Sequence, residues 1–147
     1  MKPAISPLPR TVGVVGLGLM GSSIAACLVS SGFRVIGYAR RATTVRRSGG
    51  YLREALRDLK RHESKPVALT PLLRRYRATT SIADLARCDF AIESVIEDLK
   101  IKQGLIGDLE QVLPVRAVIA SNTSSIPISI LQSRANHPER VDRKSVV

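Results

Sequence analysis

The stretch TVGVVGLGLMG, residues 11–21, decides the fold. Its first seven residues are apolar, β-branched or glycine, a composition typical of a buried strand. Apolar residues then recur at helical spacing as far as Ser31, and Gly32 predicts the end of that helix. A second apolar run, FRVIGYA at residues 33–39, predicts another strand. Together they form a βαβ unit within about 30 residues, the length that this motif needs.

The junction of the first strand and the helix carries the pattern G-x-G-x-x-G, formed by Gly16, Leu17, Gly18, Leu19, Met20 and Gly21. The first glycine permits a tight turn, the second lets a pyrophosphate approach the backbone, and the third lets the helix pack against the strand. The helix N-terminus adds free N–H groups and a partial positive charge. Because two predicted strands bracket the pattern, we expect these six residues to bind a dinucleotide rather than only to form a turn.

The rest of the chain alternates short apolar runs with amphipathic segments. Further strands are predicted at residues 77–80, 90–95 and 117–121, and helices at residues 99–113 and 127–135. Strands that alternate with helices predict a parallel sheet with right-handed crossovers. We therefore predict an α/β protein with a doubly wound parallel sheet of the Rossmann type, which binds ligands at the carboxyl ends of its strands.

An insertion follows the second strand. Residues 43–77 are rich in arginine and helical in pattern, and Pro66 and Pro71 break the segment into two pieces, which predicts a helical hairpin. Apolar residues recur on one face of its first half, at Leu52, Leu56 and Leu59. The other face carries a basic stripe formed by Arg53, Arg57, Lys60 and Arg61.

The end of the second strand bears on the choice of dinucleotide. NAD-binding domains usually place an acidic residue there, about 20 residues after the glycines, to bind the ribose hydroxyls. Here the position is occupied by Ala39, followed by Arg40 and Arg41. Two guanidinium groups suit the 2′-phosphate of NADP(H), which we predict is favoured over NAD(H). The alternative is that both arginines face solvent and that NAD binds through its pyrophosphate alone.

Composition narrows the class of protein. The 147 residues carry a formal net charge of +11, which would suit a nucleic-acid binder, but only 3% are aromatic and could stack on bases. We therefore expect no nucleic-acid partner. No apolar run approaches the roughly 20 residues of a membrane helix, and no metal-ligand spacing occurs. Cys27 and Cys88 lie in apolar patterns, which predicts buried thiols in a cytoplasmic protein.

Two later segments resemble a known family. Residues 89–102 read DFAIESVIEDLKIK, and residues 117–128 read AVIASNTSSIPI. Together with the GLGLMG turn, they resemble the L-3-hydroxyacyl-CoA dehydrogenases over residues 11–141. The resemblance implies an oxidoreductase that transfers hydride between the 3-hydroxy group of an acyl-CoA and the nicotinamide.

The resemblance also implies roles for particular residues. Glu97 and Lys102 match positions that contact the cofactor beside the nicotinamide ribose. Ser124 matches the serine between cofactor and substrate, and Asn122 the asparagine of the same turn. The basic residues of the hairpin that would meet the CoA phosphates are Arg57, Lys60 and Arg61. From the residues alone, Asn122 and Ser124 would be read as helix caps, and Glu97 and Lys102 as surface charges.

The pattern departs from the family near its end. In the family, the strand after residues 137–141 leads to a catalytic histidine and a C-terminal helical domain, which makes the homodimer interface. We expect the sixth strand, this histidine and this domain to be missing here, so that the chain alone is inactive. Residues 1–10 are predicted to be a disordered leader, residues 11–141 the dinucleotide-binding domain, and residues 142–147 a non-native tail. Alternatives are a non-catalytic NADP(H)-binding module and a fragment of a related hydroxy-acid dehydrogenase.

Overall fold

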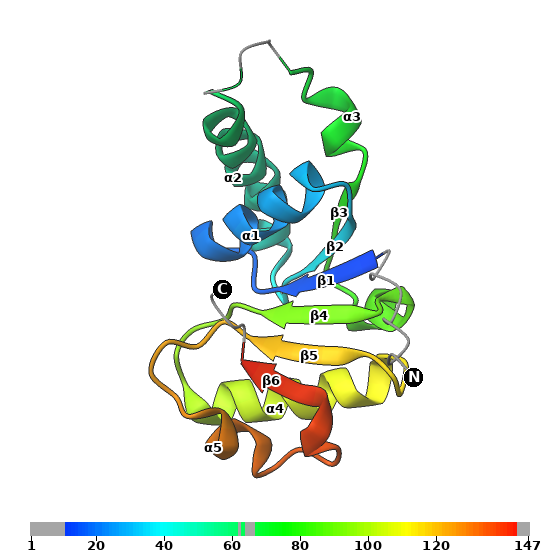
Figure 1. Cartoon of the computed structure of the whole chain (residues 1–147), viewed down its shortest axis with the longest axis vertical. Helices are drawn as coiled ribbons and strands as arrows, with labels where there is room; N and C mark the ends of the chain where they lie inside the picture. Colours follow the sequence, from blue (N-terminus) through cyan, green and yellow to red (C-terminus); the bar gives the residue numbers. More distant parts are fainter. Residues whose placement is uncertain (1–10, 62, 64–66, 144–147) are drawn as a thin grey trace, which may run out of the picture.

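The protein is described here by a computed structural model that places residues 11–61, 63 and 67–143. A six-stranded sheet forms its centre, with the strand order β3-β2-β1-β4-β5-β6 (Figure 1). Every neighbouring pair of strands is parallel. The strands are β1 (Thr11–Val15), β2 (Arg34–Tyr38), β3 (Tyr76–Thr79), β4 (Phe90–Glu93), β5 (Val118–Ser121) and β6 (Val141–Arg143). The prediction of a doubly wound parallel sheet is confirmed.

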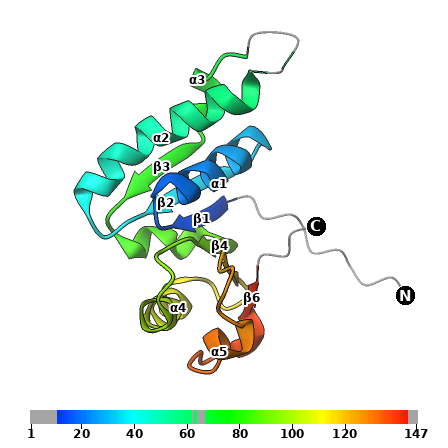
Figure 2. The ribbon, with the colours of Figure 1, turned by 90° about the vertical axis from the view of Figure 1, so that its left-hand side faces the viewer.

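Helices connect the strands and cover both faces of the sheet. They are α1 (Leu19–Ser30), α2 (Ala42–Lys60), α3 (Thr70–Leu73), α4 (Leu99–Val112) and α5 (Ile128–Gln132), with the 3₁₀ helices η1 (Ile82–Arg87) and η2 (Pro138–Arg140). Figure 2 shows α1 and α2 beside β1, β2 and β3, and α4 and α5 beside β4, β5 and β6. Two apolar clusters result, one centred on Val14, Val35 and Leu56, the other on Leu85, Ile106 and Ile119.

The expectation that the sixth strand is missing was wrong. β6 pairs with β5 in parallel, with Val141 opposite Ile119 and Asp142 opposite Ala120. Val141 is 2% exposed, and Gln132 donates a hydrogen bond of 2.6 Å to its carbonyl oxygen. Three extended residues are enough to pair with the edge of β5, although they are too few to show a strand pattern in the sequence. The strand includes two residues of the segment predicted as a non-native tail, while residues 144–147 and 1–10 lie outside the described residues.

The insertion after β2 is an unequal hairpin. Its first arm, α2, has 19 residues, whereas its second arm, α3, has four and carries Pro71 in its first turn. Leu52 and Leu56 are fully buried as predicted, but Leu59 is 44% exposed. A 19-residue helix is about 28 Å long and outruns strands of four or five residues, which span about 16 Å, so its last turn has no sheet to pack on. The hairpin also ends before β3, which begins at Tyr76.

The two cysteines differ in their surroundings. Cys88 is buried, and burial together with the neighbouring Asp89 raises the pKa of its thiol to about 11. The prediction of a buried thiol was wrong for Cys27, which is exposed on α1 because its helix face points away from the sheet. Among residues 11–61, 63 and 67–143, no helix combines the length and the apolar character needed to cross a membrane.

Candidate functional site

The turn between β1 and α1 contains three glycines, and contacts within the protein require glycine at two of them. Gly16 has a φ of +93°, and a Cβ there would lie 2.5 Å from the Ser94 carbonyl oxygen. A Cβ on Gly21 would lie 1.7 Å from the Gly16 carbonyl oxygen. At Gly18, in contrast, a Cβ would meet no protein atom within 4 Å. The second glycine is thus not required by packing, as expected where a pyrophosphate crosses the backbone.

The first turn of α1 is open to a ligand. Gly18 is its N-cap, and no side chain caps the free N–H groups of the turn, which are the groups that bind anions at helix N-termini. Leu19 and Met20 are 69% and 60% exposed, whereas Leu17 is buried in the core at 1%. Of the six residues predicted to bind the dinucleotide, Leu17 can therefore contribute only its backbone.

The end of β2 lies beside this turn. The backbone N–H of Gly16 donates to the Tyr38 carbonyl oxygen at 2.9 Å, which joins the two segments. Ala39 is buried, and the side chains of Arg40 and Arg41 are exposed. From Ala39 through the next 14 residues the sequence contains no carboxylate. The structure therefore brings two cations, and no acidic residue of this segment, to the place where an adenosine ribose binds in such folds.

A buried ion pair lies at the carboxyl ends of β4 and β5. The Lys102 ammonium group on α4 lies 2.8 and 2.9 Å from the two carboxylate oxygens of Glu93, the last residue of β4. The two side chains are 1% and 0% exposed. Ser121, the last residue of β5, donates its hydroxyl to the same carboxylate, and the backbone N–H of Val95 donates to it at 3.2 Å. The pair therefore joins two strands, a loop and a helix.

Glu97 forms the solvent-facing side of the same cluster. Its carboxylate accepts hydrogen bonds from the hydroxyls of Thr123 and Ser125, the second at 2.9 Å, and lies 3.3 Å from the Lys102 ammonium group. The hydroxyl of Thr123, then the contacts of Ser125 and Lys102, lower the Glu97 pKa to about 2. Its side chain remains 37% exposed, so the cluster presents a fixed negative charge at the carboxyl edge of the sheet.

The turn after β5 carries Asn122 and Ser124, the two residues predicted for catalysis. The Asn122 side chain donates to the Ser94 hydroxyl at 3.3 Å, and its backbone N–H donates to the Glu93 carbonyl oxygen at 2.9 Å. Ser124 is exposed. The alternative prediction, that Asn122 and Ser124 cap a helix, is wrong for α5. The N-cap of α5 is Pro127, and no side chain forms a capping hydrogen bond with this helix. The alternative prediction of an ordinary surface charge is likewise wrong for Lys102, whose side chain is 1% exposed.

The structure gathers most of the predicted site but not all of it. The glycine turn, Glu97, Lys102 and the turn after β5 all lie at the carboxyl ends of β1, β4 and β5. The basic residues predicted for CoA lie elsewhere, because the C-terminal end of α2 and the loop after β5 are at opposite ends of the molecule in Figure 1. Lys60 is paired with Glu63 at 2.7 Å and Arg61 with Asp58 at 2.8 Å.

Sequence reasoning missed Glu93, Ser121 and Thr123, which hold this edge together. A signal for Glu93 was available, since a carboxylate that ends the apolar strand FAIE has to be paired if it is buried. The two hydroxyl residues showed no such signal. In the part of the chain that the structure describes, no cluster of three or more His, Cys, Asp or Glu side chains could hold a metal ion.

We expect Lys102→Met to lower the free energy of unfolding by about 3–5 kcal/mol, because it leaves the Glu93 carboxylate buried without its partner. Urea unfolding of the purified chain measures this change. Lys100→Met on the exposed face of the same helix is the matched control and should change stability by no more than about 0.5 kcal/mol. The double variant Glu93→Leu, Lys102→Met should recover much of the loss. Equal effects of the two lysine substitutions would contradict the buried pair.

We also expect the Glu97 carboxyl to remain ionised to about pH 2 in the folded chain, below its ordinary pKa of 4.5. A lowered pKa means that this group stabilises the fold above about pH 4.5 and that the stabilisation is lost as the pH falls towards 2. The carboxyl-carbon chemical shift measured by NMR reports the titration. Thr123→Val should raise the pKa, and Thr43→Val on exposed α2 should leave it unchanged. A midpoint near 4.5 in the unmodified chain would rule the cluster out.

Comparisons with known proteins agree with this geometry. Residues 11–143 match the family described as 3-hydroxyacyl-CoA dehydrogenase, NAD binding domain. A "Probable 3-hydroxybutyryl-CoA dehydrogenase" of Deinococcus radiodurans is 35% identical over 128 residues, which cover 86% of this chain and 45% of that protein. A 5-formyl-3-hydroxy-2-methylpyridine 4-carboxylate 5-dehydrogenase of Mesorhizobium japonicum is 31% identical over 134 residues, covering 90% and 42% respectively.

A solved structure extends the comparison to the backbone. The crystal structure of a 3-hydroxybutyryl-CoA dehydrogenase of Escherichia coli K12 has a TM-score of 0.82 and 33% sequence identity, over 91% of this chain and 29% of that one. The chain thus spans less than half of the length of each of these relatives. The matched part contains the glycine turn, the buried ion pair and the turn after β5, so the chain belongs to the family of 3-hydroxyacyl-CoA dehydrogenase NAD-binding domains.

Proposed function

We propose that the chain binds NADP(H) in preference to NAD(H), with the pyrophosphate over Gly18 and the first turn of α1. The observation that supports dinucleotide binding at this turn is the contrast among its three glycines, of which only Gly18 has no packing role in the protein. The preference for NADP(H) rests on Arg40 and Arg41. Arg40 and Arg41, both exposed beside the turn, would pair with a 2′-phosphate. NAD(H) would lack this phosphate and gain nothing from the two cations.

In the whole protein, we propose that this domain serves the oxidation of a 3-hydroxyacyl-CoA to the 3-oxoacyl-CoA, or the reverse reaction. The bound dinucleotide supplies the hydride acceptor or donor. Ser124 and Asn122 lie on the turn where nicotinamide and substrate would meet, and Thr123 anchors that turn to Glu97. The fixed charge of Glu97 would orient the nicotinamide ribose by accepting hydrogen bonds from its hydroxyls. Lys102 would act indirectly, because its ammonium group holds the Glu97 carboxylate in place.

Proton transfer from the alcohol needs a base that these residues do not provide. Imidazole is suited to the task near neutral pH, but His137 precedes β6 and so lies towards the amino ends of the strands, away from the turn with Ser124. Its backbone N–H donates to Glu110 at 2.7 Å. His62 lies outside the described residues. We expect this chain to bind dinucleotide without turning over acyl-CoA by itself.

Substrate and assembly extend the proposal beyond this domain. Of the three residues predicted to meet CoA phosphates, we retain Arg57, which is exposed near the end of α2, because Lys60 and Arg61 already have carboxylate partners. The heteroaromatic carboxylate named for the Mesorhizobium japonicum relative supports a second candidate, a related dehydrogenase with another hydroxy substrate. We propose a cytoplasmic homodimer for the whole protein, and the two free thiols fit a reducing compartment.

The glycine contrast leads to a direct test. We expect Gly18→Ala to weaken NADPH binding by about tenfold or more, since the added methyl group occupies the path of the pyrophosphate. Folding should change by less than about 1 kcal/mol, because a φ of −72° suits alanine and no protein atom is met. NADPH fluorescence titration and thermal unfolding measure the two effects. Gly104→Ala on α4 is the control and should leave binding unchanged. Unaltered binding by Gly18→Ala would refute the proposed site.

Cofactor preference has its own test. The double variant Arg40→Ala, Arg41→Ala should weaken NADPH binding by about tenfold or more and NADH binding by less than about twofold, because only NADPH carries the phosphate that the guanidinium groups bind. The same titrations with Arg46→Ala, Arg53→Ala remove the same charge from exposed positions of α2 and should affect neither dinucleotide selectively. An equal loss for NADPH and NADH would show that the two arginines do not select the cofactor.

A further inference from the structure

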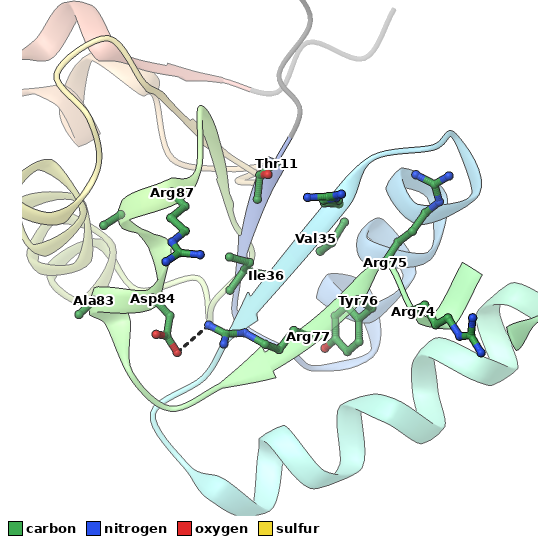
Figure 3. A pocket seen from close by; sticks show the side chains of 12 residues that line it. Thr11, Val35, Ile36, Arg74, Arg75, Tyr76, Arg77, Ala83, Asp84 and Arg87 are labelled. Atoms are coloured by element: carbon green, nitrogen blue, oxygen red, sulfur yellow. Dashed lines mark ion pairs between the residues drawn. The ribbon is translucent and has the colours of Figure 1, made fainter. Parts of the chain in front are cut away.

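A hollow lies on the sheet face that carries η1. The crossover from β3 to β4 is only this six-residue 3₁₀ helix, so it does not cover the outer strands as α1 and α2 cover the opposite face. The hollow has a volume of about 660 Å³, with Thr11, Ile36 and Arg77 of three strands and Arg87 of η1 among its lining residues (Figure 3). A small-molecule site typically has a volume of this order.

The lining of the hollow is strongly basic. It contains five arginines, Arg34, Arg74, Arg75, Arg77 and Arg87, and a single carboxylate, Asp84. Asp84 lies 3.0 Å from the Arg77 guanidinium group, drawn as a dashed line in Figure 3, and accepts a hydrogen bond of 2.6 Å from the Thr79 hydroxyl. The one negative charge is therefore already held by neighbours, and it offsets only one of the five positive charges.

Most of these guanidinium groups have donors to spare. Arg75 uses one N–H to bind the Gly32 carbonyl oxygen at 2.7 Å. Within residues 11–61, 63 and 67–143, no hydrogen bond or ion pair engages the guanidinium groups of Arg34, Arg74 or Arg87. Figure 3 shows Arg77 of β3 and Arg87 of η1 on the side of Asp84, whereas Arg74 and Arg75 extend away from that group. The lining therefore offers cations from β2, β3 and η1, namely Arg34, Arg77 and Arg87, with Asp84 as its one carboxylate.

We propose that this hollow binds an oligophosphate anion, either a free condensed phosphate or the phosphate chain of a nucleotide. Planar guanidinium groups bind phosphate oxygens through paired hydrogen bonds, and several of them around one cavity suit a ligand with several phosphates. Tyr76 is the aromatic residue of the lining, and its hydroxyl donates to Ser48 of α2 on the other face of the sheet. No ring of the lining is therefore offered for base stacking, which disfavours nucleic acid.

This site is separate from the proposed dinucleotide site. Thr11 begins β1, and Gly16 follows its end, so the two lie about 16 Å apart along an extended strand. Arg40 and Arg41 of the dinucleotide site are not among the lining residues of the hollow. Both sites could be occupied at once, and failure of one proposal leaves the other standing.

Calorimetric titration of the chain with inorganic tripolyphosphate tests the proposal. We expect one-to-one binding that saturating NADPH leaves unchanged. The double variant Arg34→Gln, Arg87→Gln should lose about tenfold or more in affinity, because each substitution removes a charged donor from the hollow. Arg46→Gln, Arg53→Gln on exposed α2 is the charge-matched control and should lose less than about twofold. A parallel titration with ATP distinguishes the two sources, since a nucleotide ligand should bind more tightly than the free phosphate.

Three results would overturn the proposal. The first is no binding of tripolyphosphate at moderate ionic strength, and the second is an equal loss in the two double variants, which would indicate attraction by net charge alone. The third is tighter binding of a short single-stranded oligonucleotide that the Arg34→Gln, Arg87→Gln variant abolishes, which would make the hollow a nucleic-acid site. Thermal unfolding of both variants verifies that a loss of affinity is not a loss of fold.

Discussion

The ion pair between Glu93 and Lys102 is the constraint on which the carboxyl edge of the sheet depends. Removing a carboxylate and an ammonium group from water costs several kcal/mol for each, so every remaining donor and acceptor has to be satisfied. Glu93 does this with Ser121 and the backbone of Val95, and Lys102 does it with Glu97. The end of β4, the end of β5, the loop between β4 and α4 and the first turns of α4 therefore take up one arrangement. A change at any of them would remove a hydrogen-bond or charge partner from the buried pair.

The site takes its shape from this pair. The Glu97 carboxylate lies against the buried Lys102 ammonium group and accepts hydrogen bonds from the hydroxyls of Thr123 and Ser125. The turn after β5 is therefore bound to a carboxylate whose lowered pKa keeps it ionised in the physiological range. Ser124 lies between these two anchors and remains exposed. Two fixed neighbours hold Ser124 in one place, which the role that we propose for it between cofactor and substrate requires.

The large positive charge of the chain is spread over several separate surfaces. Arg40 and Arg41 lie at the carboxyl edge, beside the glycine turn. The arginines of the hollow gather beside η1, where a short crossover leaves the outer strands without a helix. Five further basic residues lie on α2, and Lys60 at its end and Arg61 just after it are paired with Glu63 and Asp58. The net charge is therefore spread over at least three surfaces, and composition alone could not separate them.

The sequence by itself determined the βαβ unit, the glycine turn and the alternation of strands and helices, because these depend on residues close together in the chain. It also pointed to Glu97, Asn122 and Ser124 through resemblance. Only the tertiary structure decided that Lys102 is buried beneath Glu97, that Ser121 completes the pair from 28 residues away, and that Val141–Arg143 adds a sixth strand. The hollow of arginines was likewise invisible, since its residues come from four segments. Periodicity tells which face of an element is apolar, but which faces meet, and which charges are enclosed between them, is settled only when the elements pack.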